Sequence, residues 1–333
     1  MACLSNRVSL SIGDLENMLG SQKLPGIVEQ CEERFLSRVD AIAEKIVQDT
    51  SLRAIFLSGP TASGKTTFTN RMVSRLQAKN RPAFCLSLDN YYQLSDLHFD
   101  EKGRPDYESI ETLNLPCILR DIRLLLEGEE VCLSEFHFGN GGSSTVSETP
   151  VRMKKDEILL IEGLHSLSTE ISGAFSREMW AGIFLMPWGG VVSDRRLVES
   201  RDVRLFRRLI RDSRHRNAGA VATLDYWPMV ISSEQHCFGA YLRRADFYMN
   251  TMLDYETMIT APLAISDILR DLEMDESGAL SPSGFIRPYH PDRSFADKES
   301  AVRWAKKWIE DLSLIPACDG NVVPPHSILH EFI

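Results

Sequence analysis

The stretch that most constrains the fold is GPTASGKT, residues 59–66, which matches the pattern G-x-x-x-x-G-K-[ST]. The apolar run before it, residues 53–58, has the composition of a buried strand. The residues after it, 67–78, show the spacing of an amphipathic helix. A strand, a glycine-rich turn and a helix in this order gather backbone N–H groups at the start of the helix, where they bind anions. The chain is therefore expected to hold phosphate groups at this turn.

Further apolar runs repeat the alternation of strand and helix. They predict strands at residues 82–88, 157–163 and 182–186. Residues 110–128 have a helical pattern, although Pro116 leaves the start of that helix open. The alternation predicts an α/β fold, a P-loop NTPase-type doubly wound parallel sheet with helices on both faces. Residues 131–138 and 150–153 predict instead an inserted β-hairpin beside that sheet.

The two ends of the chain predict helices outside this alternation. In residues 27–48, Phe35, Val39, Ile42 and Ile46 fall on one stripe, which indicates a packing helix. Residues 299–314 show a second amphipathic pattern. We expect residues 1–50 to form an N-terminal helical leader. Residues 51–333 should form one P-loop domain with a C-terminal extension.

Composition excludes several classes of protein. The net charge of −10 over 333 residues argues against a general nucleic-acid binder, because the phosphate backbone favours basic surfaces. The seven cysteines form no C-x-x-C pair, so neither a zinc knuckle nor a disulfide framework is indicated. The start of the chain lacks the apolar segment of a signal peptide, and no run reaches the length of a membrane span. We expect a cytoplasmic protein without nucleic-acid or membrane partners. Whether it forms a homo-oligomer is left open by the sequence.

The residues of GPTASGKT have separate chemical roles. The expected phosphate-binding set is Gly59, Pro60, Thr61, Ala62, Ser63, Gly64, Lys65, Thr66 and Thr67. Lys65 would reach the β and γ phosphates of ATP, and Thr66 would offer its hydroxyl to Mg²⁺. Glu162, which ends the run ILLIE, is expected to bind Mg²⁺ directly or through water. A glycine-rich turn without a nucleotide and an ordinary strand-end carboxylate stay open as alternatives.

A phosphate-binding turn does not by itself separate a kinase from a switch. Guanine-specific switches usually carry an N-K-x-D motif, and this sequence has none. It has instead LSLDNYY, residues 86–92, in which Asp89 ends the second predicted strand. A carboxylate there would accept the proton of an acceptor hydroxyl and would also lie near Mg²⁺. The alternative for Asp89 is a helix or turn cap.

Residues 202–217 concentrate arginines in an otherwise acidic chain. At helical spacing Arg204, Arg207, Arg208 and Arg211 share one face. Guanidinium groups over a transferring phosphoryl group would neutralise the charge that builds up in the transition state. A solvated basic face and a small nucleic-acid patch are the alternatives.

Six segments together resemble one family of enzymes: SGPTASGKTTF, SLDNYY, PDYESIETL, LLIEGLHSL, DVRLFRRLIRDSRHR and PPHSILHEFI. The sequence is similar to the uridine kinase and phosphoribulokinase family, over roughly residues 50–333, and most of all to its bacterial uridine-kinase-like branch. The resemblance implies that Asp89 is the catalytic base and that Asp106 binds ribose hydroxyls. It implies that Arg204 lies near the acceptor and the phosphates. The remaining implied roles are phosphate binding and lid closure by Arg207, Arg208, Arg211, Arg214 and Arg216, and acceptor binding by Tyr91, Tyr92, Phe136 and His137.

The hairpin departs from the family pattern. Relatives that phosphorylate uridine tend to show Tyr-Asp-Phe where this chain has Phe136, His137 and Phe138, followed by residues 139–143 (GNGGS). A pocket built to hydrogen-bond a base edge would lose those bonds, which puts uridine itself in doubt as the acceptor. His137 either replaces a recognition contact or is an exposed hairpin residue.

Three functions are compatible with these observations. The first is an ATP- and Mg²⁺-dependent kinase that phosphorylates a primary hydroxyl of a uridine- or cytidine-like nucleoside or a related small molecule. The second is a sugar or sugar-phosphate kinase of the phosphoribulokinase type, for which Arg104 and Arg152 are the only cations expected near the hairpin. The third is a nucleotide-binding regulator without turnover.

Overall fold

The computed structural model describes residues 7–20, 22–93, 97–137 and 143–333. Its central sheet has five parallel strands: β2 (Ala54–Ser58), β3 (Ala83–Ser87), β6 (Ile158–Glu162), β7 (Trp180–Met186) and β10 (Phe247–Asn250). Their order is β10-β7-β2-β6-β3, so the predicted doubly wound parallel sheet is confirmed. Of these five strands, the sequence patterns missed β10. Because β2 is central, the turn after it opens at the middle of the carboxyl edge, where ligands bind in open α/β sheets.

Helices cover both faces of this sheet because successive side chains of each strand point to opposite faces. On β2, Ile55 and Leu57 join the core formed with α2 (Leu24–Gln48) and α3 (Lys65–Ala78). Phe56 joins the other core, formed with α4 (Leu115–Glu127). The helix predicted at 110–128 thus begins at Leu115, with Pro116 in its first turn, where proline is tolerated.

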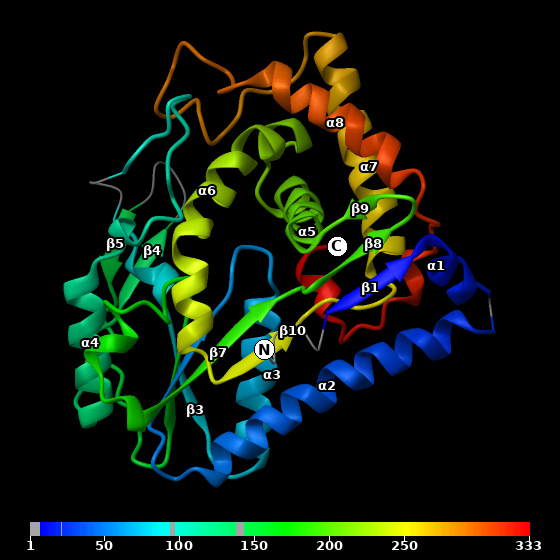
Figure 1. The fold of residues 1–333 in the computed structure, drawn as a ribbon. Coiled ribbons are helices and arrows are strands. Elements are labelled where there is room, and N and C mark those ends of the chain that lie inside the picture. The colour runs from blue at the N-terminus through cyan, green and yellow to red at the C-terminus, as the bar shows by residue number, and fades with distance from the viewer. Residues whose placement is uncertain (1–6, 21, 94–96, 138–142) are drawn as a thin grey trace.

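A second group of helices lies beyond the carboxyl ends of the strands (Figure 1). The group is α5 (Ser200–His215), α6 (Ala220–Arg244), α7 (Glu256–Glu276) and α8 (Lys298–Leu312). Helix α5, which carries the arginines, packs against both α6 and α7. The helix predicted at 299–314 is confirmed as α8. This packing brings the arginine helix over the turn that follows β2.

The N-terminal residues are joined to the main body by both a strand and a helix. Strand β1 (Val8–Ser11) pairs in parallel with β8 (Gly189–Val192), which pairs with β9 (Arg196–Val198). Ser11 and Asp14 form a capping box at the start of α1 (Ile12–Met18). The predicted stripe of α2 is buried, with Val39 and Ile46 fully so, and α2 packs on α3. The leader therefore contributes a strand as well as helices.

The predicted hairpin is confirmed, with a different second arm. Strands β4 (Ser134–His137) and β5 (Ser143–Val146) are antiparallel, and a bridge between Val131 and Val151 extends the pairing. The hairpin packs against η1 (Leu88–Tyr91), which follows β3. Phe138 and residues 139–142 lie outside the described residues.

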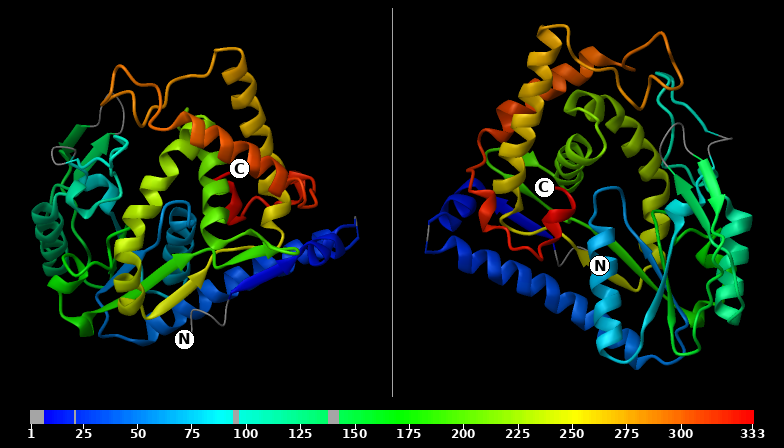
Figure 2. Two further views of the ribbon diagram at one scale, coloured as in Figure 1. Left: turned by 45° about the horizontal axis from the view of Figure 1, so that its top comes forward. Right: turned by 180° about the vertical axis from the view of Figure 1, so that it is seen from behind.

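Short 3-10 turns complete the fold at η2 (Ile110–Thr112), η4 (Ser172–Ala174), η5 (Arg177–Met179), η6 (Gly320–Val322) and η7 (Ile328–Glu331). After α8 the chain runs through η6 and returns to α3 at η7, as the red segment in Figure 2 shows. No helix in the described part of the chain combines the length and the apolar composition that a membrane span requires.

Candidate active site

The turn after β2 forms a tight concave loop. Gly64 has φ +88° and Ala62 has φ 56°, so the backbone turns through the left-handed region twice before α3 begins. A Cβ atom at Gly59 would lie 2.7 Å from the carbonyl oxygen of Leu185, so β7 leaves room only for glycine there. The Lys65 ammonium donates to the carbonyl oxygens of Gly59 (2.9 Å) and Pro60 (3.2 Å). The lysine thus lies across the loop, and the N-terminus of α3 opens beside it.

Oxygen donors suitable for Mg²⁺ lie at the same edge of the sheet. Thr66 is exposed in the first turn of α3, and Glu162 ends β6, the neighbour of β2. Ser87 Oγ donates to Glu162 Oε1 at 2.5 Å. Burial, followed by the charge of Asp89, raises the pKa of Glu162, and Lys65 opposes this. Among the described residues, no three or more His, Cys, Asp or Glu side chains are grouped so that they could hold a metal ion.

Asp89 lies in η1, directly after β3. Its side chain is exposed to solvent, yet the protein atoms around it displace enough water to be the main cause of its raised pKa. Lys65 opposes this rise, whereas Glu108 adds to it, so all three groups interact across one site. Within the described residues no side chain or backbone group hydrogen-bonds to the Asp89 carboxylate, so the structure does not use it as a cap.

Two of the four face-sharing arginines are buried against carboxylates. Arg204 makes a bidentate pair with Glu234 of α6, with N–O distances of 2.8 and 2.7 Å. Arg207 does the same with Glu256 of α7, at 2.5 and 2.8 Å. Each also donates to a carbonyl of the phosphate loop, Arg204 to Thr61 and Arg207 to Ala62, both at 3.3 Å. These two arginines brace the loop from the side of α5.

Arg208 and Arg211 contact a side chain of the loop rather than its carbonyl groups. Arg208 and Arg211 point at the Thr61 hydroxyl, at 3.3 and 3.5 Å, and both pair with Asp212. Arg214 and Arg216 are exposed at the end of α5, and Arg216 is close enough to lower the pKa of Asp89. Arg204, Arg207 and Arg208 are thus buried, Arg211 is half-buried, and Arg214 and Arg216 are exposed.

A cavity of about 420 Å³ lies next to this arrangement. Asp106, Glu108 and Glu170 line it, together with His165 and His236. Burial raises the pKa of Asp106, and hydrogen bonds from Ser233 and the N–H group of Glu108 oppose this. The described lining includes no lysine or arginine. The cavity is therefore suited to hydroxyl and N–H donors rather than to anions.

Glu108 connects this cavity to the phosphate loop. Its carboxylate pairs with Arg208 at 3.3 Å, and its carbonyl accepts a hydrogen bond of 2.8 Å from His165 Nε2. Since a carbonyl only accepts, Nε2 carries the proton, and Nδ1 accepts from the Tyr241 hydroxyl at 2.6 Å. Burial lowers the pKa of His165 to about 4, so the ring is neutral near pH 7. His165 thereby fixes the backbone that carries Asp106 and Glu108.

The aromatic residues expected at the acceptor are distributed more widely. Tyr91 is buried and donates to Asp121 Oδ2 at 2.9 Å, away from the cavity. The Tyr92 hydroxyl donates to the carbonyl of Tyr107, and its ring lies 5.6 Å from that of Phe136. His137 is exposed and bonds Thr145 across the hairpin. Phe136 and His137 do not line the cavity, although their hairpin packs on the turn that carries Asp89.

Residues 54–189 match the model of the phosphoribulokinase / uridine kinase family. This region belongs to that family. The resemblance expected from the sequence is thus confirmed, and the region is a P-loop kinase domain. The family match includes the phosphate loop, Asp89, Asp106 and Glu162, and it ends before α5.

Similar solved structures are distant. One is a candidate fructose transport system kinase from Silicibacter sp. TM1040, with 14% identity, a TM-score of 0.41, and coverage of 63% of this chain and 98% of that one. Another is the YGR205w protein, with 15% identity, a TM-score of 0.28, and coverage of 41% of this chain and 52% of that one. A search of curated proteins finds no significant match.

Sequence patterns did not single out the carboxylates that complete the site. Glu234 and Glu256 lie inside long helices and belong to no motif. Glu108 lies within PDYESIETL, where only Asp106 was assigned a role. The signal that could have indicated these carboxylates was the excess of arginines on one face of α5. Guanidinium groups that become buried require carboxylate partners.

The buried ion pair of Arg207 and Glu256 is expected to matter for the stability of the folded protein. Both side chains are fully buried, so Glu256→Ala leaves a buried, uncompensated guanidinium. We expect the free energy of unfolding to fall by about 3–5 kcal/mol, measured by urea denaturation. Glu299→Ala is the matched control, since the side chains of Glu299 and Arg303 are 93% and 71% exposed. Its free energy of unfolding should fall by less than ~1 kcal/mol. Equal losses in the two variants would contradict this account of the pair.

Proposed function

We propose that the chain is an ATP- and Mg²⁺-dependent kinase that transfers the γ-phosphoryl group to a primary hydroxyl of a nucleoside or nucleoside-like molecule. The observation that carries the proposal is the juxtaposition of Asp89 and Lys65. The charge of Lys65 acts on Asp89, and so does the charge of Glu108, which lines the cavity together with Asp106. An acceptor hydroxyl in that cavity would have a proton acceptor beside it and a phosphoryl donor in front of it.

Each group has a distinct part in the proposed transfer. Asp89 accepts the proton of the acceptor hydroxyl, whose oxygen attacks the γ phosphorus as the bond to ADP breaks. The Lys65 ammonium, which donates to the carbonyls of Gly59 and Pro60 in the structure, turns to the β and γ phosphate oxygens. Thr66 and Glu162 would hold Mg²⁺, which supplies positive charge to the phosphates when bound. The exposed Arg214 and Arg216 would close over ATP and exclude water.

The division among the arginines refines their proposed roles. Arg208 and Arg211 donate to the Thr61 hydroxyl and not to a loop carbonyl, so they are the better candidates for direct contact with phosphate. Arg204 and Arg207 already have all the carboxylate partners that a bidentate guanidinium takes. We assign these two to positioning the loop carbonyls, so that they act on the nucleotide through the backbone.

The cavity supports an uncharged, hydroxyl-bearing acceptor over a phosphorylated sugar. Asp106, Glu108 and Glu170 would repel a phosphate group, and they accept hydrogen bonds from ribose-type hydroxyls. The two cations expected near the hairpin are already paired. Arg104 is buried against Asp100 and Asp225, and the exposed Arg152 lies 3.7 Å from Glu130. The phosphoribulokinase-type alternative therefore loses its candidate phosphate ligands.

A screen of acceptors tests this function. Purified protein with ATP and Mg²⁺ is given nucleosides, free pentoses or sugar phosphates, and release of ADP is measured. We expect nucleosides to raise the rate above the background hydrolysis by ten times or more, because hydroxyl binding beside Asp89 supplies the nucleophile. Sugar phosphates should leave the rate at background. Release of ADP only with sugar phosphates would contradict the proposed acceptor, and no release with any compound would contradict the kinase.

The proposed compartment is the cytoplasm. None of the six cysteines within the described residues forms a disulfide, which is typical of proteins in reducing compartments.

A further inference from the structure

The last turn of the chain lies on the phosphate loop. We call residues 327–332 the strap. Within it, the carboxylate of Glu331 is directed at α3, and its Oε2 accepts a hydrogen bond of 3.0 Å from the backbone N–H group of Thr67. Thr67 is the third residue of α3, so this N–H group belongs to the helix N-terminus that faces the phosphate site. The P-loop pattern uses such N–H groups to hold the α and β phosphates. Glu331 therefore occupies a donor that the nucleotide needs.

Two more contacts hold the strap against the loop. A Cβ atom on Gly64 would collide with the Ile328 side chain, so Ile328 lies directly on this glycine. The ring centroid of Phe332 lies 4.8 Å from the guanidinium carbon of Arg207, the same arginine that braces Ala62. Ile328 and Phe332 are fully buried. The position of Glu331 is thus determined by apolar anchors on either side of it.

The Glu331 carboxylate also places a negative charge at the start of α3, beside the phosphate loop. A carboxylate in this place would repel the phosphates of a nucleotide as well as compete for the N–H group. The side chain itself is only half-buried, so it is able to rotate away while Ile328 and Phe332 stay in place.

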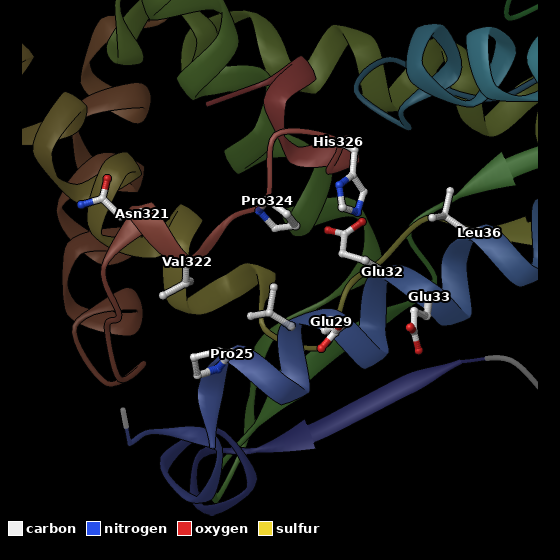
Figure 3. Close-up of a pocket in the computed structure, with 10 residues that line it drawn as sticks. Pro25, Glu29, Glu32, Glu33, Leu36, Asn321, Val322, Pro324 and His326 are labelled. Carbon is white, nitrogen blue, oxygen red and sulfur yellow. The ribbon is translucent and has the colours of Figure 1, made fainter. Parts of the chain in front are cut away.

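Residues 321–326, which precede the strap, border a cavity. A cavity of about 720 Å³ separates α2 from residues 321–326. Figure 3 shows Pro324 and His326 on the C-terminal side of this cavity and Glu32 of α2 facing them. Glu32 is 2% exposed, its Oε1 accepts from the Tyr255 hydroxyl at 2.7 Å, and its Oε2 has no hydrogen-bond partner among the described residues. The segment that leads into the strap thus borders a cavity on the side of α2.

We propose that Glu331 sets the nucleotide affinity of the phosphate loop by competing with the α-phosphate for the N–H group of Thr67. The inference rests on the proposed function, since it requires that the loop binds a nucleotide. In the free protein the carboxylate caps α3, and a bound nucleotide displaces it. The strap thus weakens binding of any nucleotide that carries an α-phosphate.

The test measures dissociation constants of ADP by titration calorimetry for the full chain and for Glu331→Gln, Glu331→Ala and His330→Gln. Both Glu331 variants should bind ADP tighter by on the order of fivefold, because a competing anion has been removed. His330 is exposed and next to Glu331, so His330→Gln should leave the dissociation constant unchanged. In the wild-type chain, ADP should also speed hydrogen exchange in a peptide covering residues 327–333.

The outcomes separate the two proposals. Equal or weaker ADP binding by both Glu331 variants, with clear binding by the wild type, would overturn the competition. Weaker binding seen only with Mg²⁺ would also overturn it, since Glu331 would then be a metal ligand. Failure of every protein to bind ADP, with Lys65→Ala no different from the wild type, would overturn the proposed nucleotide site itself. If Glu331→Ala does not fold, the test uses Glu331→Gln. This variant keeps an oxygen that accepts from the Thr67 N–H group but removes the negative charge that competes with the phosphate.

Discussion

Replacing Asp89 with Asn should lower the rate of phosphoryl transfer by a factor of about 10²–10⁴, the usual contribution of a positioned general base. Asn keeps the shape of the side chain but accepts no proton. ATP binding should stay intact, because the carboxylate is proposed to touch the acceptor and not the cradle. The measurements are single-turnover transfer with the preferred acceptor and the dissociation constant of ATP. Asp40→Asn, an exposed carboxylate on α2, is the matched control and should leave both unchanged.

The raised pKa of Asp89 adds a dependence on pH. Transfer by the wild-type chain should fall as pH decreases through that pKa, because the base becomes protonated. Since burial raises the pKa, this decline should occur at higher pH than for an ordinary aspartate. The residual transfer by Asp89→Asn should not show the decline. An identical acid limb in both proteins would exclude Asp89 as the titrating base.

The same shift predicts the sign of the effect on stability. A carboxyl group whose pKa is higher in the folded than in the unfolded protein is harder to ionise when folded, so its charge costs stability above the unfolded pKa. Asp89→Asn should therefore keep or slightly raise the Tm at pH 7. This separates a catalytic loss from a folding defect: a large fall in Tm would mean that the lost transfer says nothing about proton abstraction.

Replacing Lys65 with Ala should lower kcat/KM for ATP by a factor of about 10²–10³, as expected when one preorganised positive donor is removed from a developing anion. Within the described residues the ammonium hydrogen-bonds to the carbonyls of Gly59 and Pro60 alone, so few native hydrogen bonds are lost with it. The fold should remain, with a Tm within a few degrees of the wild type. Initial-rate kinetics over a range of ATP concentrations measure the effect.

Lys79→Ala is the matched control because Lys79 follows the other end of the same helix and pairs with Glu44 at the surface. This variant should keep the kinetics of the wild type. Full activity of Lys65→Ala would contradict the assignment of residues 59–66 as the phosphate cradle. A loss in Lys79→Ala equal to that in Lys65→Ala would show that general damage to α3, and not loss of a phosphate contact, lowers the rate.

The parts of the site that sequence patterns predicted are those built from neighbouring residues. A phosphate cradle needs consecutive N–H groups, and its strand and helix adjoin it, so GPTASGKT and its flanks specify β2 and α3 locally. Asp89 and Glu162 were predicted because parallel strands end at one edge of a sheet, and the strand order places β6 between β2 and β3. Edge strand β10 was missed because FYMN is too short to show a period.

The partners of the arginines could not be predicted in this way. Glu234 is 30 residues from Arg204, and Glu256 is 49 residues from Arg207. A single glutamate within a helix has the same sequence signature whether it faces water or a buried guanidinium. Only the packing of α5 against α6 and α7 distinguishes the two cases, and it moves two arginines from direct phosphate contact to support of the loop.

By itself, the sequence determined the α/β fold, the phosphate cradle, and the carboxylates at the sheet edge, because each follows from short-range spacing of residue types. The tertiary structure alone decided which carboxylates pair with the arginines of α5, which carboxylates line the cavity beside the phosphate loop, and what covers the start of α3. The last contact joins Thr67 and Glu331, which are 264 residues apart. Contacts of that kind depend on how whole elements pack, and no local pattern encodes them.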